Sequence, residues 1–196
     1  MRTCPPVLIM LLALAASLNL MACQPYSYRA TVLDSPKPLK DFTLDSADGS
    51  PFTLSGSDKL LLLYFGYTHC LDVCPATLAQ LKIARQKLGD KASAVQVAFI
   101  TVDPERDTEA RLTAYLANFD PSFIGLRTTN AALLQDIAED FGAYYQADQH
   151  EPLAEQYLVT HTSSILVVRD TKLLAAIPDD ATGEEIANDV IHLLSR

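Results

Sequence analysis

The sequence predicts an α/β domain, in which a central β-sheet is covered by helices. The run Leu60–Gly66 is continuously apolar, as expected of a strand that is buried on both faces of a sheet. Beyond it, strand-length apolar runs alternate with amphipathic helical segments, which is the pattern of an α/β fold. Two cysteines, Cys70 and Cys74, follow the buried strand directly. Open α/β sheets place their functional sites at this end of a strand.

The first half of the domain is expected to contain a β-hairpin, the buried strand and a helix. A turn at Asp48-Gly49 separates two short apolar stretches within residues 42–54, which is typical of a hairpin with a glycine turn. Pro75 suits the first turn of a helix, and Gly89 suits its end. Leucines at helical spacing give this helix one apolar face, at positions Leu78, Leu81 and Leu88.

The second half adds three more strands and three helices. A strand over residues 95–102 leads into two helices, the second of them capped by Asn130 and ended by Gly142. Residues 144–160 are expected to form a long, partly charged loop. The remaining elements are, in order, a strand over residues 164–168, a turn at Asp170-Thr171, a short strand through Ile177 and a last helix with a capping box of Thr182 and Glu185. This order resembles the thioredoxin fold with an N-terminal β-hairpin and inserted helix and hairpin elements.

The N-terminus has the pattern of an export signal. Arg2 precedes an apolar stretch over residues 7–20, which suits a signal-peptide core and is short for a membrane span. The motif Leu20-Met21-Ala22-Cys23 resembles a bacterial lipobox, which implies cleavage before Cys23 and attachment of diacylglycerol to its sulfur. The alternatives are an ordinary signal that is cut elsewhere and an uncleaved anchor.

These features divide the chain into a lipoprotein signal peptide (1–22), a lipid-anchored tether (23–40) and one domain (41–196). The tether is expected because its residues include Pro25, Pro36 and Pro38 and show little apolar periodicity. The expected location is the bacterial cell envelope, with the lipid in a membrane and the domain outside the cytoplasm, in the periplasm. Gln24 follows the lipid cysteine, and the choice between inner and outer membrane stays open.

The charge of the chain argues against nucleic acid as a partner. The full sequence has 15 Lys and Arg, 24 Asp and Glu, and a formal charge of −9. Removal of residues 1–22 takes away Arg2 and no acidic residue, so the charge becomes −10. Binding to phosphates requires a basic face, which this composition does not favour.

Cys70 and Cys74 are the cysteines available for chemistry once Cys23 carries lipid. Cys74 at a helix N-terminus is expected to have a lowered pKa, and Cys70 can approach it closely enough for a disulfide. Three residues separate the two cysteines, where an ordinary thiol-disulfide exchanger has two. Two thiolates with one imidazole would suit Cu(I). The pair can therefore hold a metal or each other.

His161 is the preferred third ligand among the four histidines. His192 is expected to be structural and His150 to be solvated. His69 should point away from Cys70, because neighbouring residues of an extended segment face opposite ways. His161 precedes the strand over residues 164–168, where thioredoxin-type oxidoreductases usually carry a cis-proline beside the cysteine loop. All three methionines lie within residues 1–22, so the mature chain offers no thioether for copper.

Several separated motifs resemble the Sco/SenC family of copper-binding proteins. The first is Tyr64-Phe65-Gly66-Tyr67-Thr68-His69-Cys70-Leu71-Asp72-Val73-Cys74-Pro75. The later ones lie in residues 100–108, 115–126 and 159–163, and the resemblance covers residues 41–196. Leu71 departs from the family, which usually has proline there, and Gly125-Leu126-Arg127-Thr128 departs from its usual Gly-Leu-Thr-Gly.

The resemblance implies a thioredoxin-like fold that holds Cu(I) or Cu(II) with Cys70, Cys74 and His161. It also implies a role in assembling the dinuclear copper site of cytochrome c oxidase, as a metallochaperone or as a dedicated thiol-disulfide reductase that uses Cys70 and Cys74. The expected partners are the copper-site subunit of the oxidase and other copper chaperones or thiol reductases. The chain is not expected to be a classical enzyme, beyond thiol-disulfide oxidoreductase activity.

Two further points stay open. Asp72, between the cysteines, and Asp103, at the end of the second strand, are candidates to support the ligands from behind. Loop capping and turn formation explain these two residues equally well. A peroxidase is a third functional hypothesis, because Val73-Cys74-Pro75 resembles the peroxidatic motif of peroxiredoxins. The threonine that those enzymes place before the cysteine is Leu71 here, which argues against it.

Overall fold

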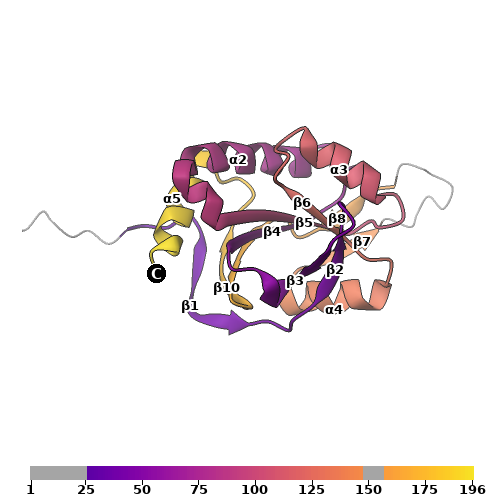
Figure 1. Ribbon diagram of the computed structural model, residues 1–196, viewed down its shortest axis with the longest axis horizontal. Helices are drawn as coiled ribbons and strands as arrows, with labels where there is room; N and C mark the ends of the chain where they lie inside the picture. The colour runs from indigo at the N-terminus through magenta and orange to yellow at the C-terminus, as the bar shows by residue number, and fades with distance from the viewer. Residues whose placement is uncertain (1–25, 148–156) are drawn as a thin grey trace, which may run out of the picture.

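The computed structural model describes residues 26–147 and 157–196 (Figure 1). The predicted signal peptide, Cys23 and His150 lie outside these ranges. The helices within them are α2 (Val73–Leu88), α3 (Glu109–Ala117), α4 (Ala131–Phe141), α5 (Gly183–Leu194) and the 3₁₀ helices η2 (Leu54–Gly56) and η3 (Gly89–Ala94). The strands are β1 (Thr31–Pro38), β2 (Thr43–Ser46), β3 (Pro51–Thr53), β4 (Leu60–Gly66), β5 (Val95–Thr101), β6 (Ile124–Arg127), β7 (Tyr145–Ala147), β8 (Val159–His161), β9 (Ile165–Arg169) and β10 (Lys172–Ile177).

Eight strands form one sheet in the order β1-β10-β9-β4-β5-β6-β2-β3, and β7 and β8 form a separate two-stranded ribbon. Strands β4, β5 and β6 are parallel, and the other neighbours are antiparallel. The register of β4 and β5 places Gly66 opposite Thr101. The chain segments that follow these two strands therefore leave the sheet side by side, at its carboxyl edge.

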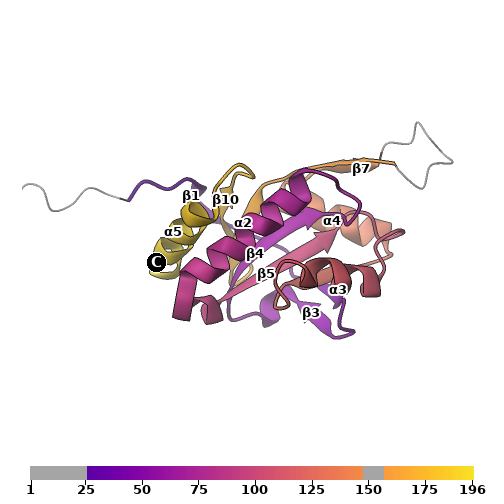
Figure 2. The same cartoon turned by 90° about the horizontal axis from the view of Figure 1, so that it is seen from above.

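Helices cover both faces of the sheet, which explains why β4 is apolar throughout. Adjacent residues of a strand point to opposite faces. On one face, Phe65 contacts Phe141 of α4 at a ring distance of 5.9 Å. On the other face, Tyr64 contacts Phe99, which in turn contacts Tyr115 of α3. Helices α2 and α3 lie together on this second face, and α5 lies beside α2 (Figures 1 and 2).

The predicted α/β class and the thioredoxin-like order of elements are confirmed. Strand β4 has the predicted bounds, β2 and β3 form the predicted hairpin, and β9 and β10 form the second one. Asn130 caps α4 by accepting from the backbone N–H of Leu133, and Gly142 ends it with a φ of 71°. Thr182 and Glu185 form the predicted capping box of α5.

Four strands differ from the expectation. Strand β1 lies within the segment predicted to be a tether, and β6 contains Gly125-Leu126, where the sequence predicts no strand. Strands β7 and β8 occupy the two described ends of the predicted loop over residues 144–160. Strand β1 is an exposed edge strand with two prolines, a composition that edges tolerate and that gives no apolar periodicity. The other three strands are too short to show a period.

The residues before β1 are also fixed to the domain. The buried carboxylate of Asp189 in α5 accepts hydrogen bonds from the Tyr26 hydroxyl at 2.7 Å and from the backbone N–H of Ala30 at 2.7 Å. The Tyr26 ring stacks on His192 at a centroid distance of 3.5 Å. This contact gives His192 a structural role, as predicted. The part of the chain expected to be a flexible tether is thus attached to α5 from Tyr26 onward.

No helix within residues 26–147 and 157–196 has the length and hydropathy needed to cross a bilayer.

Candidate metal and thiol site

The two cysteines lie between the end of β4 and the first turn of α2. Cys74 is fully buried, Cys70 is half-buried, and both are free thiols. The two sulfur atoms and a ring nitrogen of His161 all lie within 4.8 Å of one another. The described chain therefore brings together the three residues that the sequence analysis singled out, from segments 87 residues apart.

His161 is held in a defined orientation. It lies at the end of β8, where pairing with Tyr145 of β7 fixes its backbone. Its Nδ1 is 3.0 Å from the carbonyl oxygen of Thr162, and its Nε2 is 3.3 Å from Cys74 Sγ. Because only a protonated Nδ1 can donate to that carbonyl, the lone pair of Nε2 faces the sulfurs. Tyr64 and Tyr67 contact the imidazole edge-to-face, at 6.0 and 5.8 Å.

The two thiols differ strongly in acidity. Hydrogen bonding, first from the Cys74 thiol and then from the backbone N–H groups of Asp72 and Cys74, lowers the pKa of Cys70 to about 3. The adjacent Cys70 sulfur, together with burial, raises the pKa of Cys74. The prediction of a lowered Cys74 pKa is therefore wrong. The loop folds back so that the N–H of Cys74, at the start of α2, points at Cys70 Sγ at 3.3 Å, and the helix N-terminus stabilises the other thiolate.

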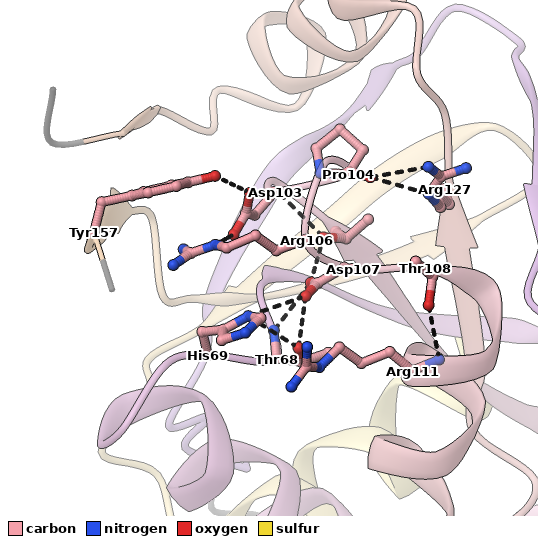
Figure 3. Close-up of polar contacts among 11 residues, drawn as sticks. Thr68, His69, Asp103, Pro104, Arg106, Asp107, Thr108, Arg111, Arg127 and Tyr157 are labelled. Carbon is pink, nitrogen blue, oxygen red and sulfur yellow. Dashed lines mark hydrogen bonds and ion pairs between the residues drawn. The ribbon is translucent and has the colours of Figure 1, made fainter. Parts of the chain in front are cut away.

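A second polar cluster lies behind the cysteine loop (Figure 3). Donor atoms of His69, Asp103 and Asp107 lie within 4.8 Å of one another, so their spacing alone would suit a metal ion. However, Asp103 already accepts from Arg106 Nε and from the hydroxyl of Tyr157, both at 2.5 Å. A guanidinium in that position repels a cation. We therefore interpret this cluster as a hydrogen-bonded network.

The remaining predicted residues have varied surroundings. Asp72 is exposed, stands at the N-cap of α2 and makes no side-chain capping bond. Leu71 is 89% exposed. His69 turns toward Asp107, with its Nδ1 at 3.6 Å from Oδ1, and away from the sulfurs, as expected. Asp103 is buried and lies in the second cluster.

Sequence reasoning missed the contact of Thr68 with Asp107 and that of Tyr157 with Asp103. The only available signal was that Asp103 and Asp107 follow a strand parallel to the one before the cysteines.

Comparison with known proteins gives a consistent result. The SCO1/SenC family model matches residues 32–195. The apo Sco1 protein of Thermus thermophilus is 38% identical, with a TM-score of 0.77 over 87% of this chain and 99% of that one. Bradyrhizobium japonicum ScoI with copper bound is 33% identical, with a TM-score of 0.69 over 79% of this chain and 98% of that one.

The curated relatives include longer proteins. A SCO2-like protein of Rickettsia conorii is 33% identical over 158 residues, which is 78% of this chain and 75% of the relative. The mitochondrial SCO2 homolog of Bos taurus is 35% identical over 134 residues, 67% of this chain and half of the relative. The match thus extends over most of the domain described here, while the bovine relative has additional sequence outside it.

Prediction 1 concerns the acidity of the thiols. In the reduced, metal-free protein at pH 6, iodoacetamide should modify Cys70 and leave Cys74 largely intact, because only a thiolate reacts and only Cys70 has a lowered pKa. Below a pH of about 3, where the Cys70 thiolate takes up a proton, the reaction should slow. Mass spectrometry of tryptic peptides measures the ratio. Preferential labelling of Cys74 would contradict the assignment.

Proposed function

Because the chain belongs to the SCO1/SenC family, we propose that it binds one copper ion with Cys70, Cys74 and His161 and serves in the assembly of the dinuclear copper site of cytochrome c oxidase. The observation that carries the proposal is the convergence of two thiol sulfurs and one imidazole nitrogen within 4.8 Å. Bradyrhizobium japonicum ScoI and yeast Sco1, at 33% and 26% identity, have structures with copper bound.

The donor set fits copper chemically. Sulfur and imidazole donors favour Cu(I) over hard cations such as Mg²⁺ or Ca²⁺. Because its pKa is low, Cys70 is a thiolate at neutral pH. Cys74 provides the second thiolate when metal binding displaces its proton. The Nε2 atom of His161 is available to a metal, because its Nδ1 is hydrogen-bonded to the carbonyl oxygen of Thr162. Tyr64 and Tyr67 pack edge-to-face against the imidazole.

Within this proposal, Asp103 supports the site from behind. Its carboxylate accepts from Tyr157, which precedes His161 by four residues. Asp72 is exposed beside the sulfurs, and we propose that it faces a partner protein rather than the ligands. The partner is the copper-site subunit of the oxidase, together with the copper chaperones or thiol reductases that load or reduce this chain.

Prediction 2 tests the three ligands by anaerobic Cu(I) titration with a competing chelator. Cys70→Ala, Cys74→Ala and His161→Ala should each lower the affinity by more than about 100-fold, since loss of a ligand should cost at least as much as loss of a supporting residue. His192→Ala is the matched control, because this imidazole stacks on Tyr26 and is not one of the converging donors, and it should bind as the wild type does. Wild-type affinity in His161→Ala would rule out the three-ligand site.

A second candidate function is thiol reduction of the oxidase copper site. The difference in pKa and burial between the two thiols favours this function. The Cys70 thiolate, which is half-exposed, would attack a sulfur of the partner's disulfide and form a mixed disulfide while the partner's other sulfur leaves as a thiolate. Cys74, which is buried, would then lose its proton and attack Cys70. The partner leaves as a dithiol, and two electrons pass from the Cys70–Cys74 pair to it.

Prediction 3 separates this reaction from copper delivery. Reduced, metal-free protein is mixed with the oxidised soluble copper domain of the oxidase subunit, and its free thiols are counted. If the chain is a reductase, each chain should reduce one partner molecule, and the His161→Ala variant should remain active. The mixed disulfide should accumulate in the Cys74→Ser variant but not in Cys70→Ser. If no partner thiols appear, while the copper-loaded protein still metallates the reduced partner, the reductase role fails.

We also propose that the chain is exported and held at a membrane by lipid on Cys23, with the domain in the periplasm of a bacterium. The support is the signal-like stretch over residues 7–20 and the motif that ends in Cys23.

Prediction 4 tests the anchor. Full-length protein should sediment with bacterial membranes. Cys23→Ser should lack the lipid mass and keep its signal uncleaved, unlike the control Cys4→Ser. Normal processing and unchanged mass of the mature chain in Cys23→Ser would refute lipidation.

A further inference from the structure

One short turn contacts both segments that carry the candidate ligands. The turn spans residues 103–107, directly after β5, and the N–H of Asp107 donates to the carbonyl of Asp103 at 3.0 Å to close it. The N–H of Val102 donates to the carbonyl of Gly66 at 2.9 Å. This bond continues the β4–β5 pairing past the end of β5, so the turn leaves the sheet next to the cysteine loop.

Asp107 holds the cysteine loop. Its carboxylate, which is fully buried, accepts from the backbone N–H of Thr68 at 3.0 Å and from the Thr68 hydroxyl at 2.6 Å. It also accepts from the Thr101 hydroxyl at 2.6 Å, and His69 lies beside it. A buried carboxylate is costly unless its oxygens are satisfied. If the loop moved away, the buried carboxylate would lose the two hydrogen bonds from Thr68. Cys70 lies two residues beyond Thr68, so these bonds fix the chain close to the first sulfur.

Asp103 holds the other segment. Its carboxylate accepts from the Tyr157 hydroxyl at 2.5 Å, and the guanidinium of Arg106 lies over the Tyr157 ring at 3.5 Å. Figure 3 shows Tyr157 reaching the turn on one side, while Thr68 and His69 reach it on the other. Tyr157 is followed by β8, which ends in His161.

We propose that the turn over residues 103–107 positions the cysteine pair and His161 relative to each other, with Asp107 fixing the sulfurs and Asp103 fixing the imidazole. The inference rests on the copper site proposed above and assigns this turn a role in its geometry. Asp107 and Asp103 are positioning residues, because they act through Thr68 and Tyr157 and touch none of the three donor atoms.

Prediction 5 follows from the two separate arms of the turn. Asp107→Asn replaces an acceptor oxygen with a donor and should loosen the cysteine loop. Cu(I) affinity should fall about 10- to 100-fold, and the equilibrium with glutathione should shift several-fold toward the dithiol, because the sulfurs meet less often. Tyr157→Phe should weaken Cu(I) binding in the same direction and leave the glutathione equilibrium unchanged, because His161 takes no part in the disulfide.

Controls separate positioning from general destabilisation. Thr108→Ala removes the cap of α3, whose hydroxyl accepts from the N–H of Arg111, next to the turn but away from both arms. It should lower the melting temperature and leave both readouts unchanged. Thr68→Ser keeps both bonds to Asp107 and should match the wild type. If circular dichroism shows that Asp107→Asn does not fold, Thr68→Val, which removes only the hydroxyl donor, takes its place.

The outcomes are distinguishable. Wild-type values of both readouts in folded Asp107→Asn, or equal losses in Thr108→Ala, would overturn the inference. A shifted glutathione equilibrium in Tyr157→Phe would overturn the assignment of separate arms. If the wild-type protein fails to bind Cu(I), the proposed function fails, whereas the glutathione equilibrium of Asp107→Asn still decides whether Asp107 positions the sulfurs.

Discussion

The parallel pairing of β4 with β5 is the constraint on which the rest of the site depends. Gly66 and Thr101 end these strands opposite each other, so the cysteine loop and the turn over residues 103–107 must leave the sheet together. Gly66 also allows the strand to pass close to Phe99, since a Cβ at this position would lie 2.8 Å from the Phe99 ring. The apolar packing on both faces of β4 thus determines where the polar chemistry is located.

The loop that follows β4 gives the two sulfurs different properties. Helix α2 begins at Val73, and its first N–H groups point at the sulfur that comes earlier in the chain. Cys70 gains the electrostatic benefit of the helix N-terminus, while Cys74 is buried beside it as a hydrogen-bond donor. The pair therefore consists of a half-buried thiolate at Cys70 and a buried thiol at Cys74.

The sequence was sufficient to predict the elements and residues whose signal is local. Strand β4, helix α2 and the caps of α4 and α5 follow from apolar periods and from Asn, Thr, Gly and Pro at their ends. Cys70, Cys74 and His161 could be singled out because their residue types are rare in the mature chain and suit one chemistry. Strand β1 could not be predicted because it is an exposed edge strand without an apolar period. Strand β6 and the β7–β8 ribbon could not be predicted because they are short and depend on pairing with distant strands.

The acidity of the thiols and the role of Asp107 needed the structure for the same reason. Which sulfur faces the helix N-terminus depends on how the loop folds back, and no residue pattern records this direction. An aspartate after a strand could equally cap a turn or bind water. Only the approach of Thr68, 39 residues earlier in the chain, shows that Asp107 faces the cysteine loop.

The attachment of Tyr26 to α5 limits how the domain could lie if the proposed lipid anchor is present. If Cys23 carries lipid, the chain between it and Tyr26 can reach no more than roughly 10 Å, at about 3.5 Å per residue. The end of the domain that carries α5 would then face the bilayer, and the short linker would keep it close to the lipid. Strands β4 and β5 run away from that end, and the β7–β8 ribbon lies at the far side (Figures 1 and 2). The sulfurs, which follow the carboxyl end of β4, would thus be held at the end of the domain that lies away from the lipid.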